Sequence, residues 1–413
     1  MRTWTALTVA CMAFATQASL SFGETEDAFA SKMVTLDGGD FVMGDSLSTK
    51  LHPQALPPQR VHVDAFRVDK WPATNREFRE FVRATKFKTD SEKFGWSFVL
   101  DYQATERARE LSESQVKDAS HWLAVPQAYW RQPDGPGSGI QDTLDHVAGH
   151  LSYNDAKAFC KWRGLRLLSE SEWEFAARGG EVDTKYPWGN NEPWKETDGS
   201  WPMNVWQGTF PKENDLGDGY ATTSPPQAFP PNKYGLYDVL GNVWEWTKTK
   251  YLEMHPDAIK QDQQRKGEAV QRVLRGGSFL DTADGAFNHK VDLNTRMGNT
   301  EDSASSNTGV RCAASVGPQS KESGYKYRKP SKPKGAGGIP GLDQETMQRI
   351  VEEGGIEALQ ELLGDKATVT TAGELKERQA KMHRQMEELR RMEELEKQQA
   401  TRGGGDSAEH IEL

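Results

Sequence analysis

Residues 166–174 read Arg-Leu-Leu-Ser-Glu-Ser-Glu-Trp-Glu, and this stretch decides the fold class. Ser169 followed three residues later by Glu172 is typical of a capping box, in which each side chain accepts a hydrogen bond from the backbone N–H of the other residue. Such a pair marks the first turn of an α-helix. The sequence therefore predicts a helix that includes residues 173–178.

Three further segments extend this prediction outward. Thr74 with Glu77 forms a second capping box, which predicts a helix running to about residue 85. Residues 154–162 predict another helix, and the alternating run 61–68 predicts a strand. Because such helices are few and turn residues are many, the sequence predicts an α+β domain with much irregular backbone.

Composition divides the 413 residues into one large domain with appendages. Twelve of the 13 tryptophans lie between Trp71 and Trp246, which places the core there, and we assign residues 24–318 to this domain. Residues 319–341 are basic and rich in Pro and Gly, as a linker is. Residues 342–413 predict a helical tail, with Leu and Met at helical spacing over 373–400.

Both ends of the sequence carry targeting patterns. Residues 1–23 have the charge, apolar core and small residues of a secretory signal peptide. The final tetrapeptide, residues 410–413, reads His-Ile-Glu-Leu and resembles an endoplasmic reticulum retrieval signal, although Ile411 departs from the usual Asp. No later apolar run reaches the roughly 20 residues that cross a bilayer. We therefore expect a soluble protein of the endoplasmic reticulum lumen with no membrane partner.

The net charge and the number of cysteines limit which partners and which cysteine chemistry are expected. The net charge of -10 argues against nucleic acid as a partner. Of the three cysteines, Cys11 lies in the expected signal peptide, which leaves Cys160 and Cys312. In an oxidising lumen they are expected to form a disulfide, and the alternative is a pair of buried free thiols.

Ten motifs occur in a fixed order along the chain. They are residues 38–44 (GGDFVMG), 71–75 (WPATN), 154–156 (NDA) with 160–162 (CKW), 166–174 (RLLSESEWE), 186–190 (YPWGN), 204–208 (NVWQG), 234–237 (YGLY), 241–246 (GNVWEW), 275–278 (RGGS) and 309–312 (GVRC). Together these motifs resemble the sulfatase-modifying factor family. The resemblance covers residues 32–317. It implies a single large C-type-lectin-like domain with little regular secondary structure, and it says nothing of the helical C-terminal extension.

The resemblance also implies what the chain lacks. The formylglycine-generating enzyme of this family oxidises a sulfatase cysteine with O2 and a copper ion held by two cysteines, and their positions correspond to Asp281 and Ala286 here. Soft thiolates select Cu(I), so no copper and no such catalysis are expected. Residues 281–300 resemble instead a non-catalytic paralogue within the family, which keeps a groove that includes Trp244 and Ser278.

Two calcium ions are the cofactors that the resemblance implies. The first site corresponds to the side chains of Asn204 and Asp218 with the carbonyls of Val205 and Tyr220, and the second to Asp238 and Glu245 with the carbonyls of Gly241 and Val243. Residues 214–219 form the oxygen-rich, glycine-containing loop that such a cation needs. The alternative is that Asp218 caps a turn and Glu245 is a paired core acid.

Two other side-chain groups have weaker patterns. His146 and His150 have the i,i+4 spacing of zinc ligands but lack an evident third ligand. Asp281, Asp284 and His289 form either a general acid–base group or a hydrogen-bonded rim of the groove. We favour the rim.

Two main functional classes remain. The favoured one is a non-catalytic regulator that binds sulfatases, the formylglycine-generating enzyme or both, as a possible homodimer or heterodimer, and dampens sulfatase activation. The alternative is an enzyme of the same fold with non-cysteine chemistry, using Asp281 or His289 on a different substrate. A calcium-stabilised module that recognises glycans is a third possibility, based on the lectin-like fold alone.

Overall fold

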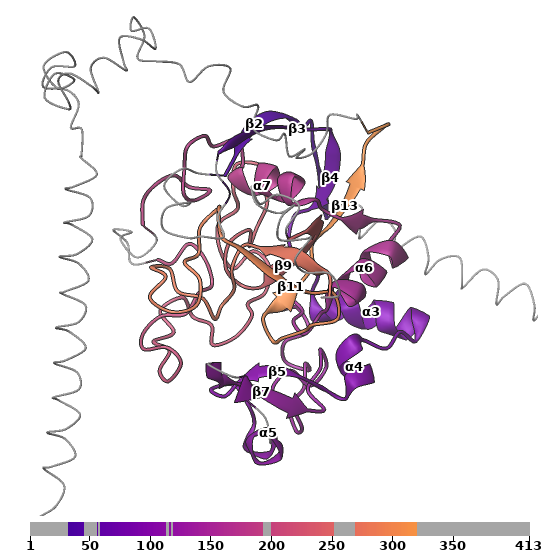
Figure 1. Cartoon of the computed structure of the whole chain (residues 1–413), viewed down its shortest axis with the longest axis vertical. Coiled ribbons are helices and arrows are strands. Elements are labelled where there is room, and N and C mark those ends of the chain that lie inside the picture. Colours follow the sequence, from indigo (N-terminus) through magenta and orange to yellow (C-terminus); the bar gives the residue numbers. More distant parts are fainter. Residues whose placement is uncertain are drawn as a thin grey trace, which may run out of the picture. The chain divides into compact units, whose positions relative to one another are not determined.

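The computed structural model describes residues 32–44, 56, 58–112, 115–116, 119–192, 200–251 and 269–319 (Figure 1). The predicted signal peptide, the helical tail and the retrieval-like tetrapeptide lie outside these residues, as does nearly all of the predicted linker. Among the described residues, no helix is both long enough and apolar enough to cross a membrane.

The described helices are short and begin at side chains that cap them. They are α3 (Asn75–Thr85), α4 (Asp90–Phe94), α5 (Glu106–Leu111), α6 (Tyr153–Trp162) and α7 (Glu170–Arg178). Thr74 and Glu77 form the predicted capping box of α3, and Ser169 and Glu172 form that of α7. Helix α7 begins at Glu170 rather than at residue 173, because the capping box itself is its first turn.

Four small sheets carry the strands. One has the order β1 (Met33–Leu36), β4 (Phe66–Asp69), β13 (Cys312–Ser315), β8 (Arg166–Leu167), and a second the order β11 (Arg296–Thr300), β10 (Gln271–Arg275), β9 (Trp244–Lys250), β12 (Thr308–Gly309). The others are β2 (Gly39–Met43) with β3 (Gln59–Val63), and β5 (Trp96–Leu100) with β7 (Ala119–Pro126) and β6 (Gln115–Val116). The predicted mixed α and β domain with little regular structure is confirmed for the described residues.

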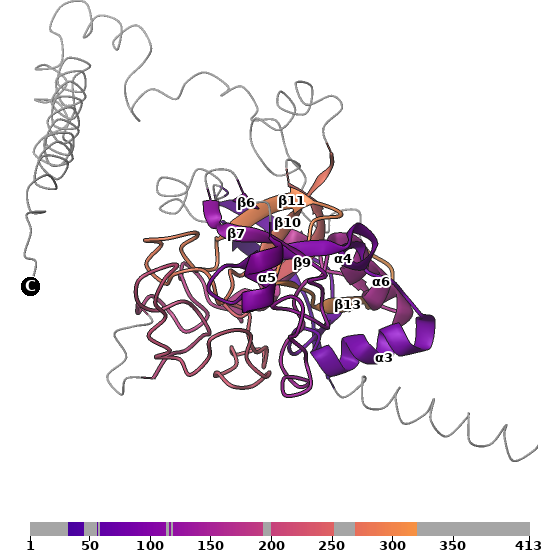
Figure 2. The ribbon, with the colours of Figure 1, turned by 90° about the horizontal axis from the view of Figure 1, so that it is seen from below.

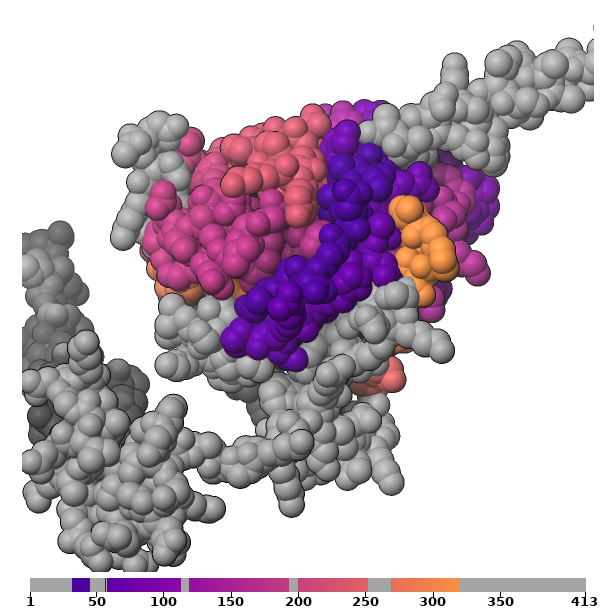
Figure 3. All heavy atoms as spheres, turned by 90° about the horizontal axis from the view of Figure 1, so that it is seen from above, coloured from indigo at the N-terminus to yellow at the C-terminus, as the bar shows by residue number. Residues whose placement is uncertain are grey.

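The predicted strand 61–68 is wrong as one element. The chain leaves the sheet at Asp64 and Ala65, so β3 pairs with β2 while β4 pairs with β1 and β13. The pairing of β4 with β13 brings the two ends of the domain together, and Figure 3 shows the N-terminal and C-terminal segments side by side on one face.

Aromatic packing and a disulfide join the helices to the sheets. Helices α3, α4 and α6 gather on one side of the domain (Figures 1 and 2), and Phe78 of α3 contacts Phe159 of α6 with ring centroids 5.7 Å apart. Cys160 of α6 and Cys312 of β13 form the predicted disulfide, with their Cα atoms 5.5 Å apart and both residues buried. The alternative of two free thiols is therefore wrong.

Candidate functional site

A tight turn after β10 places the residues of the predicted groove. Strand β10 ends at Arg275, and Gly276 follows with φ +99°. A Cβ on Gly276 would lie 2.9 Å from the carbonyl oxygen of Val239, so the close approach of the two backbones requires glycine. The turn delivers Ser278 and Asp281 beside Trp244, the first residue of β9.

Asp281 is hydrogen-bonded through both carboxylate oxygens. Its Oδ2 accepts from Trp244 Nε1 at 2.9 Å and from Ser278 Oγ at 2.6 Å. Its Oδ1 accepts from the backbone N–H of His289 at 3.1 Å. Asp281 is only 2% exposed, so these donors replace the water that a carboxylate otherwise binds. The side chain is thus an acceptor that holds three parts of the groove together.

The His289 ring lies against both Asp281 and Trp244. Its Nδ1 is 3.2 Å from Asp281 Oδ1, and its ring centroid is 5.0 Å from that of Trp244, edge to face. Burial lowers the pKa of His289, but the hydrogen bond to Asp281 and the negative charge of Asp281 outweigh it. The net result is a pKa raised above the usual value for histidine. The protonated form of His289 therefore pairs with Asp281.

A cavity of about 210 Å³ opens at this pair. The residues that line it are Phe98, Trp122, Trp244, Asp281, Asn288, His289, Met297, Asn299, Ser305 and Asn307. They come from β5, β7, β9, β11 and the loops after β10 and β11, so segments far apart in sequence build the groove. Aromatic walls and amide groups suit a peptide side chain.

Ala286, which the family resemblance assigns to the second cysteine position, does not line the cavity beside Asp281. Ala286 is exposed, and its backbone N–H donates to Asp284 Oδ1 at 2.9 Å within a surface turn. Asp284 is exposed as well, so the predicted group of Asp281, Asp284 and His289 reduces to Asp281 and His289. Neither Ala286 nor Asp284 lines the cavity.

The hydrogen-bond pattern limits the chemistry of the groove. Ser278 Oγ donates to Asp281 and accepts from Asn307 Nδ2 at 2.9 Å, so it is not hydrogen-bonded to His289. A serine nucleophile needs a base within hydrogen-bond reach, and here its hydroxyl faces a carboxylate that is already shared. Of the predicted groove residues, Trp244 lines the cavity, whereas Ser278 is buried, does not line it, and is joined to Trp244 through Asp281.

The residues of the first predicted calcium site share one loop cluster. Asp218 Oδ2 accepts from Val205 N at 2.9 Å and from Gln207 Nε2 at 2.8 Å, and Asp218 Oδ1 accepts from Tyr220 N at 2.9 Å. The Gln207 amide also contacts the carbonyl of Val205. Burial raises the pKa of Asp218. Asn204 Oδ1 is buried and has no hydrogen-bond partner.

The carboxylate of Glu245, in the second predicted site, already accepts hydrogen bonds from one cationic and one neutral side chain. Arg311 Nη2 donates to Glu245 Oε1 at 2.8 Å and Arg311 Nε to Oε2 at 3.0 Å. Trp173 Nε1 also donates to Glu245 Oε2, at 2.8 Å. This is the geometry of the paired core acid.

The remaining residues of that site lie in the turn before β9. Asp238 Oδ2 is buried without a hydrogen-bond partner, and burial raises the pKa of Asp238 to about 7. A Cβ on Gly241 would lie 2.3 Å from the carbonyl oxygen of Asn204, so the two predicted calcium loops touch each other. Val243 is buried between them and β12.

His146 and His150 do not share a metal-binding position. His150 Nε2 lies 2.8 Å from the carbonyl oxygen of Pro133 and its Nδ1 lies 2.9 Å from Ser97 Oγ, while His146 Nδ1 contacts the carbonyl oxygen of Thr223. Burial lowers the pKa of His150 to about 4. Within the described part of the chain, no group of three or more His, Cys, Asp or Glu side chains is placed to hold a metal ion.

Sequence reasoning missed the partners of the predicted residues. Gln207, Asn307 and Arg311 each bond a side chain that the sequence singled out, yet none was given a role. Two of them lie inside motifs, Gln207 in 204–208 and Arg311 in 309–312. Membership in a motif was therefore the sequence signal that could have pointed to Gln207 and Arg311. Which side chains they bond is visible only in the three-dimensional structure.

The chain is a mixed α and β domain in which a Gly-Gly-Ser turn sets the Asp281 carboxylate against the buried Trp244. Residues 19–316 match the family described as the sulfatase-modifying factor enzyme 1-like domain, and the chain belongs to this family.

Three relatives place the chain within it. The Bos taurus protein named inactive C-alpha-formylglycine-generating enzyme 2 is 48% identical over 286 residues, which cover 69% of this chain and 88% of the relative. Its Mus musculus namesake is 46% identical over 299 residues, covering 72% and 89%. The formylglycine-generating enzyme of Bos taurus is 40% identical over 285 residues, covering 69% and 75%. The chain is thus more similar to these two relatives named inactive than to the bovine enzyme.

Proposed function

We propose that this protein is a non-catalytic sulfatase-modifying-factor paralogue that binds sulfatases, the formylglycine-generating enzyme or both, and so dampens sulfatase activation. The proposal depends most on how Asp281 is bonded and where it lies. A carboxylate bonded through both oxygens stands at the position of the enzyme's first copper-binding cysteine, while the cavity beside it stays open. Similarity to relatives named inactive supports the same conclusion.

The groove suits binding without oxidation. Its cavity of about 210 Å³ has the size of a side-chain site, with Phe98, Trp122 and Trp244 as aromatic walls and Asn288 and Asn299 as amide donors and acceptors. An extended peptide such as the Cys-x-Pro-x-Arg segment of a sulfatase can place a side chain there. Cys160 and Cys312 are joined to each other, so neither offers a thiol to it.

A binding experiment with a cavity-filling variant tests this proposal. The mature protein is immobilised, and purified sulfatase and purified formylglycine-generating enzyme are passed over it in separate runs. Asn299→Arg fills the cavity, and Asp302→Arg places the same side chain, with a charge change of +2 rather than +1, at an exposed residue that does not line it. We expect binding by the wild type and by Asp302→Arg and a loss with Asn299→Arg. Binding of neither partner by the wild type contradicts the proposal.

The proposed location is the endoplasmic reticulum lumen. The expected signal peptide and retrieval-like tetrapeptide motivate it, and the buried Cys160–Cys312 disulfide is the chemistry of an oxidising compartment. Deleting residues 410–413 is expected to convert intracellular retention into secretion. Sedimentation of the purified protein, alone and with the formylglycine-generating enzyme, tests the proposed homodimer or heterodimer.

We also propose two structural calcium ions. Asn204 and Asp218 with the carbonyls of Val205 and Tyr220 would hold the first, and the buried, unpartnered Asn204 Oδ1 supports it. Asp238 and Glu245 with the carbonyls of Gly241 and Val243 would hold the second, with Glu245 binding the ion in addition to Arg311 and Trp173, and the unpartnered Asp238 Oδ2 supports it. All donors are oxygens, as a hard cation requires, and a bound cation would cross-link loops that have little regular structure. Metal analysis of the dialysed protein is expected to give two calcium ions and no copper per chain.

The alternative, an enzyme with non-cysteine chemistry, has the Asp281–His289 pair in its favour, because it faces the cavity. Incubation with a Cys-x-Pro-x-Arg peptide, copper and O2 separates the two proposals. Formylglycine in the product overturns the non-catalytic proposal. A different reaction that His289→Gln abolishes supports the alternative.

A further inference from the structure

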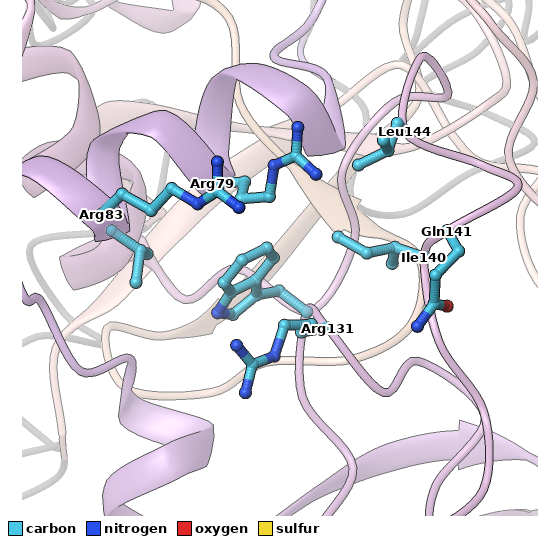
Figure 4. Close-up of a pocket in the computed structure, with 8 residues that line it drawn as sticks. Arg79, Arg83, Arg131, Ile140, Gln141 and Leu144 are labelled. Atoms are coloured by element: carbon cyan, nitrogen blue, oxygen red, sulfur yellow. The ribbon is translucent and has the colours of Figure 1, made fainter.

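A second cavity, distinct from the groove, lies beside α3. Its volume is about 220 Å³, and it shares no lining residue with the groove. Figure 4 shows Arg79 and Arg83 reaching from the helix, with Arg131, Ile140, Gln141 and Leu144 opposite. The second group belongs to residues 127–152, the loop between β7 and α6. Val82 and Trp130 complete the lining.

The cavity concentrates positive charge in an acidic protein. Three of its lining side chains are arginines and none is an acid, whereas the chain as a whole has a net charge of -10. Arg79 and Arg83 are one helical turn apart and therefore lie on the same face of α3. Among the described residues, no carboxylate forms an ion pair with Arg79, Arg83 or Arg131. Three arginines thus line a cavity in which the described residues provide no paired carboxylate.

Structural roles account for two of these arginines but not for Arg79. Arg83 lies in the last turn of α3, where a cation complements the helix dipole. Arg131 stacks on the Tyr129 ring and donates from Nε to its hydroxyl at 3.1 Å. Within the described ranges Arg79 has no such partner, and its Nε is buried there without a hydrogen bond. A buried donor without a hydrogen bond lowers the stability of the folded state. An apolar side chain in place of Arg79 should therefore stabilise the fold at least as well.

Trp130 adds an independent observation in the same cavity. The side chain is only 3% exposed, and its Nε1 is also buried without a hydrogen-bond partner. Buried indole N–H groups normally find an acceptor. Two residues from different elements that line this cavity, Arg79 and Trp130, thus each carry a buried donor without a hydrogen-bond partner among the described residues.

We propose that this cavity binds a sulfate or phosphate monoester carried on a flat, apolar body. Guanidinium groups pair with oxyanions through charge-assisted hydrogen bonds. Three guanidinium groups on two sides of the cavity match a head group with three terminal oxygens better than they match a carboxylate, which has two. Val82, Ile140, Leu144 and the Trp130 indole supply an apolar wall, and an apolar cavity of about 150 Å³ already holds benzene. The site does not depend on the proposed regulatory function.

Calorimetric titration of the full mature chain tests the proposal with four probes. 4-Nitrophenyl sulfate and 4-nitrophenyl phosphate present the head group on a ring, inorganic sulfate presents a tetrahedral anion alone, and 4-nitroanisole presents the ring alone. We expect at least one ester to bind, with inorganic sulfate and 4-nitroanisole each at least about tenfold weaker, which corresponds to about 1.4 kcal/mol. The two ester arms identify the head group. Affinity should fall as salt is added.

Arg79→Met with Arg107→Met as control separates a ligand site from a packing role. Arg107 is an exposed arginine of α5 that pairs with Glu110 outside the cavity. Arg79→Met is expected to weaken ester binding at least about tenfold while leaving the ligand-free melting temperature equal or higher, and Arg107→Met should leave ester binding unchanged. No binding of either ester by the wild type, or equal affinity in Arg79→Met, overturns the proposal.

Discussion

Trp244 Nε1 donates a 2.9 Å hydrogen bond to Oδ2 of Asp281, and both side chains are buried. The same oxygen accepts from Ser278 Oγ. A carboxylate that is buried away from water is stable only when hydrogen-bond donors surround it. The indole of Trp244 and the hydroxyl of Ser278 are two such donors. Asp281, which the family resemblance assigns to the first cysteine position of the enzyme, is therefore a hydrogen-bonded junction beside the groove.

Removing this junction should destabilise the domain. Asp281→Ala leaves the buried donors of Trp244 and Ser278 without an acceptor, and we expect a loss of about 1–3 kcal/mol in the free energy of unfolding. Urea denaturation measures it, with Asp284→Ala as control because Asp284 is exposed in the adjacent turn. Equal stability of the two variants would contradict the assigned role of Asp281.

The pair of His289 and Asp281 should make stability depend on pH. The folded pKa of His289 is raised, so its contribution is fully present below the unfolded value of about 6.5 and is lost as pH rises through the folded pKa. The stability difference between the wild type and His289→Gln should therefore be larger at about pH 5.5 than at about pH 8.5. Denaturation of both proteins at both pH values checks this, and a constant difference speaks against the pair.

Calcium removal should loosen the loops around Asn204 and Asp218. If calcium saturates the native state at about 100 times its dissociation constant, chelation removes about 2.7 kcal/mol and lowers the melting temperature. Asp218→Ala should melt at a lower temperature than the wild type in calcium and respond less to chelation. Asp215→Ala, in the same loop but outside the proposed ligand set, is the control. An unchanged wild-type melting temperature in chelator would argue against both ions.

The disulfide links α6 to β13 across a sequence separation of 152 residues. Replacing both Cys160 and Cys312 by Ala is expected to cost about 2–5 kcal/mol. Thermal and urea unfolding of the double variant measure the cost. Because both cysteines are buried, a mild reductant should leave the disulfide of the folded protein intact well below the melting temperature.

Local signals in the sequence predicted the parts of the fold that local chemistry determines. The capping boxes at Thr74 and Ser169 located two helices, and cysteine usage predicted the single disulfide. The prediction of a single strand over residues 61–68 was wrong. The alternation of apolar and polar residues does not show that Asp64 and Ala65 turn the chain from one sheet into another.

Long-range pairing of charges was not predictable in the same way. The polar run 169–172 has the look of an exposed helix start, yet Glu170 is buried between Arg275 and Arg296, whose guanidinium groups donate to it at 2.7 and 2.8 Å. Likewise the sequence marked Glu245 as a candidate ligand without its partner Arg311, 66 residues away. The resemblance also assigned Ala286 to the enzyme's second cysteine position, and in the structure Ala286 lies in a surface turn and does not line the cavity.

The most direct test of the central claim is formylglycine formation on a sulfatase by the purified formylglycine-generating enzyme, measured by mass spectrometry with increasing amounts of this protein. The account predicts slower formation with the wild type and with Asp302→Arg, little slowing with Asn299→Arg, and no product when this protein is the only catalyst. An unchanged rate at every amount added, or product from this protein alone, would contradict it.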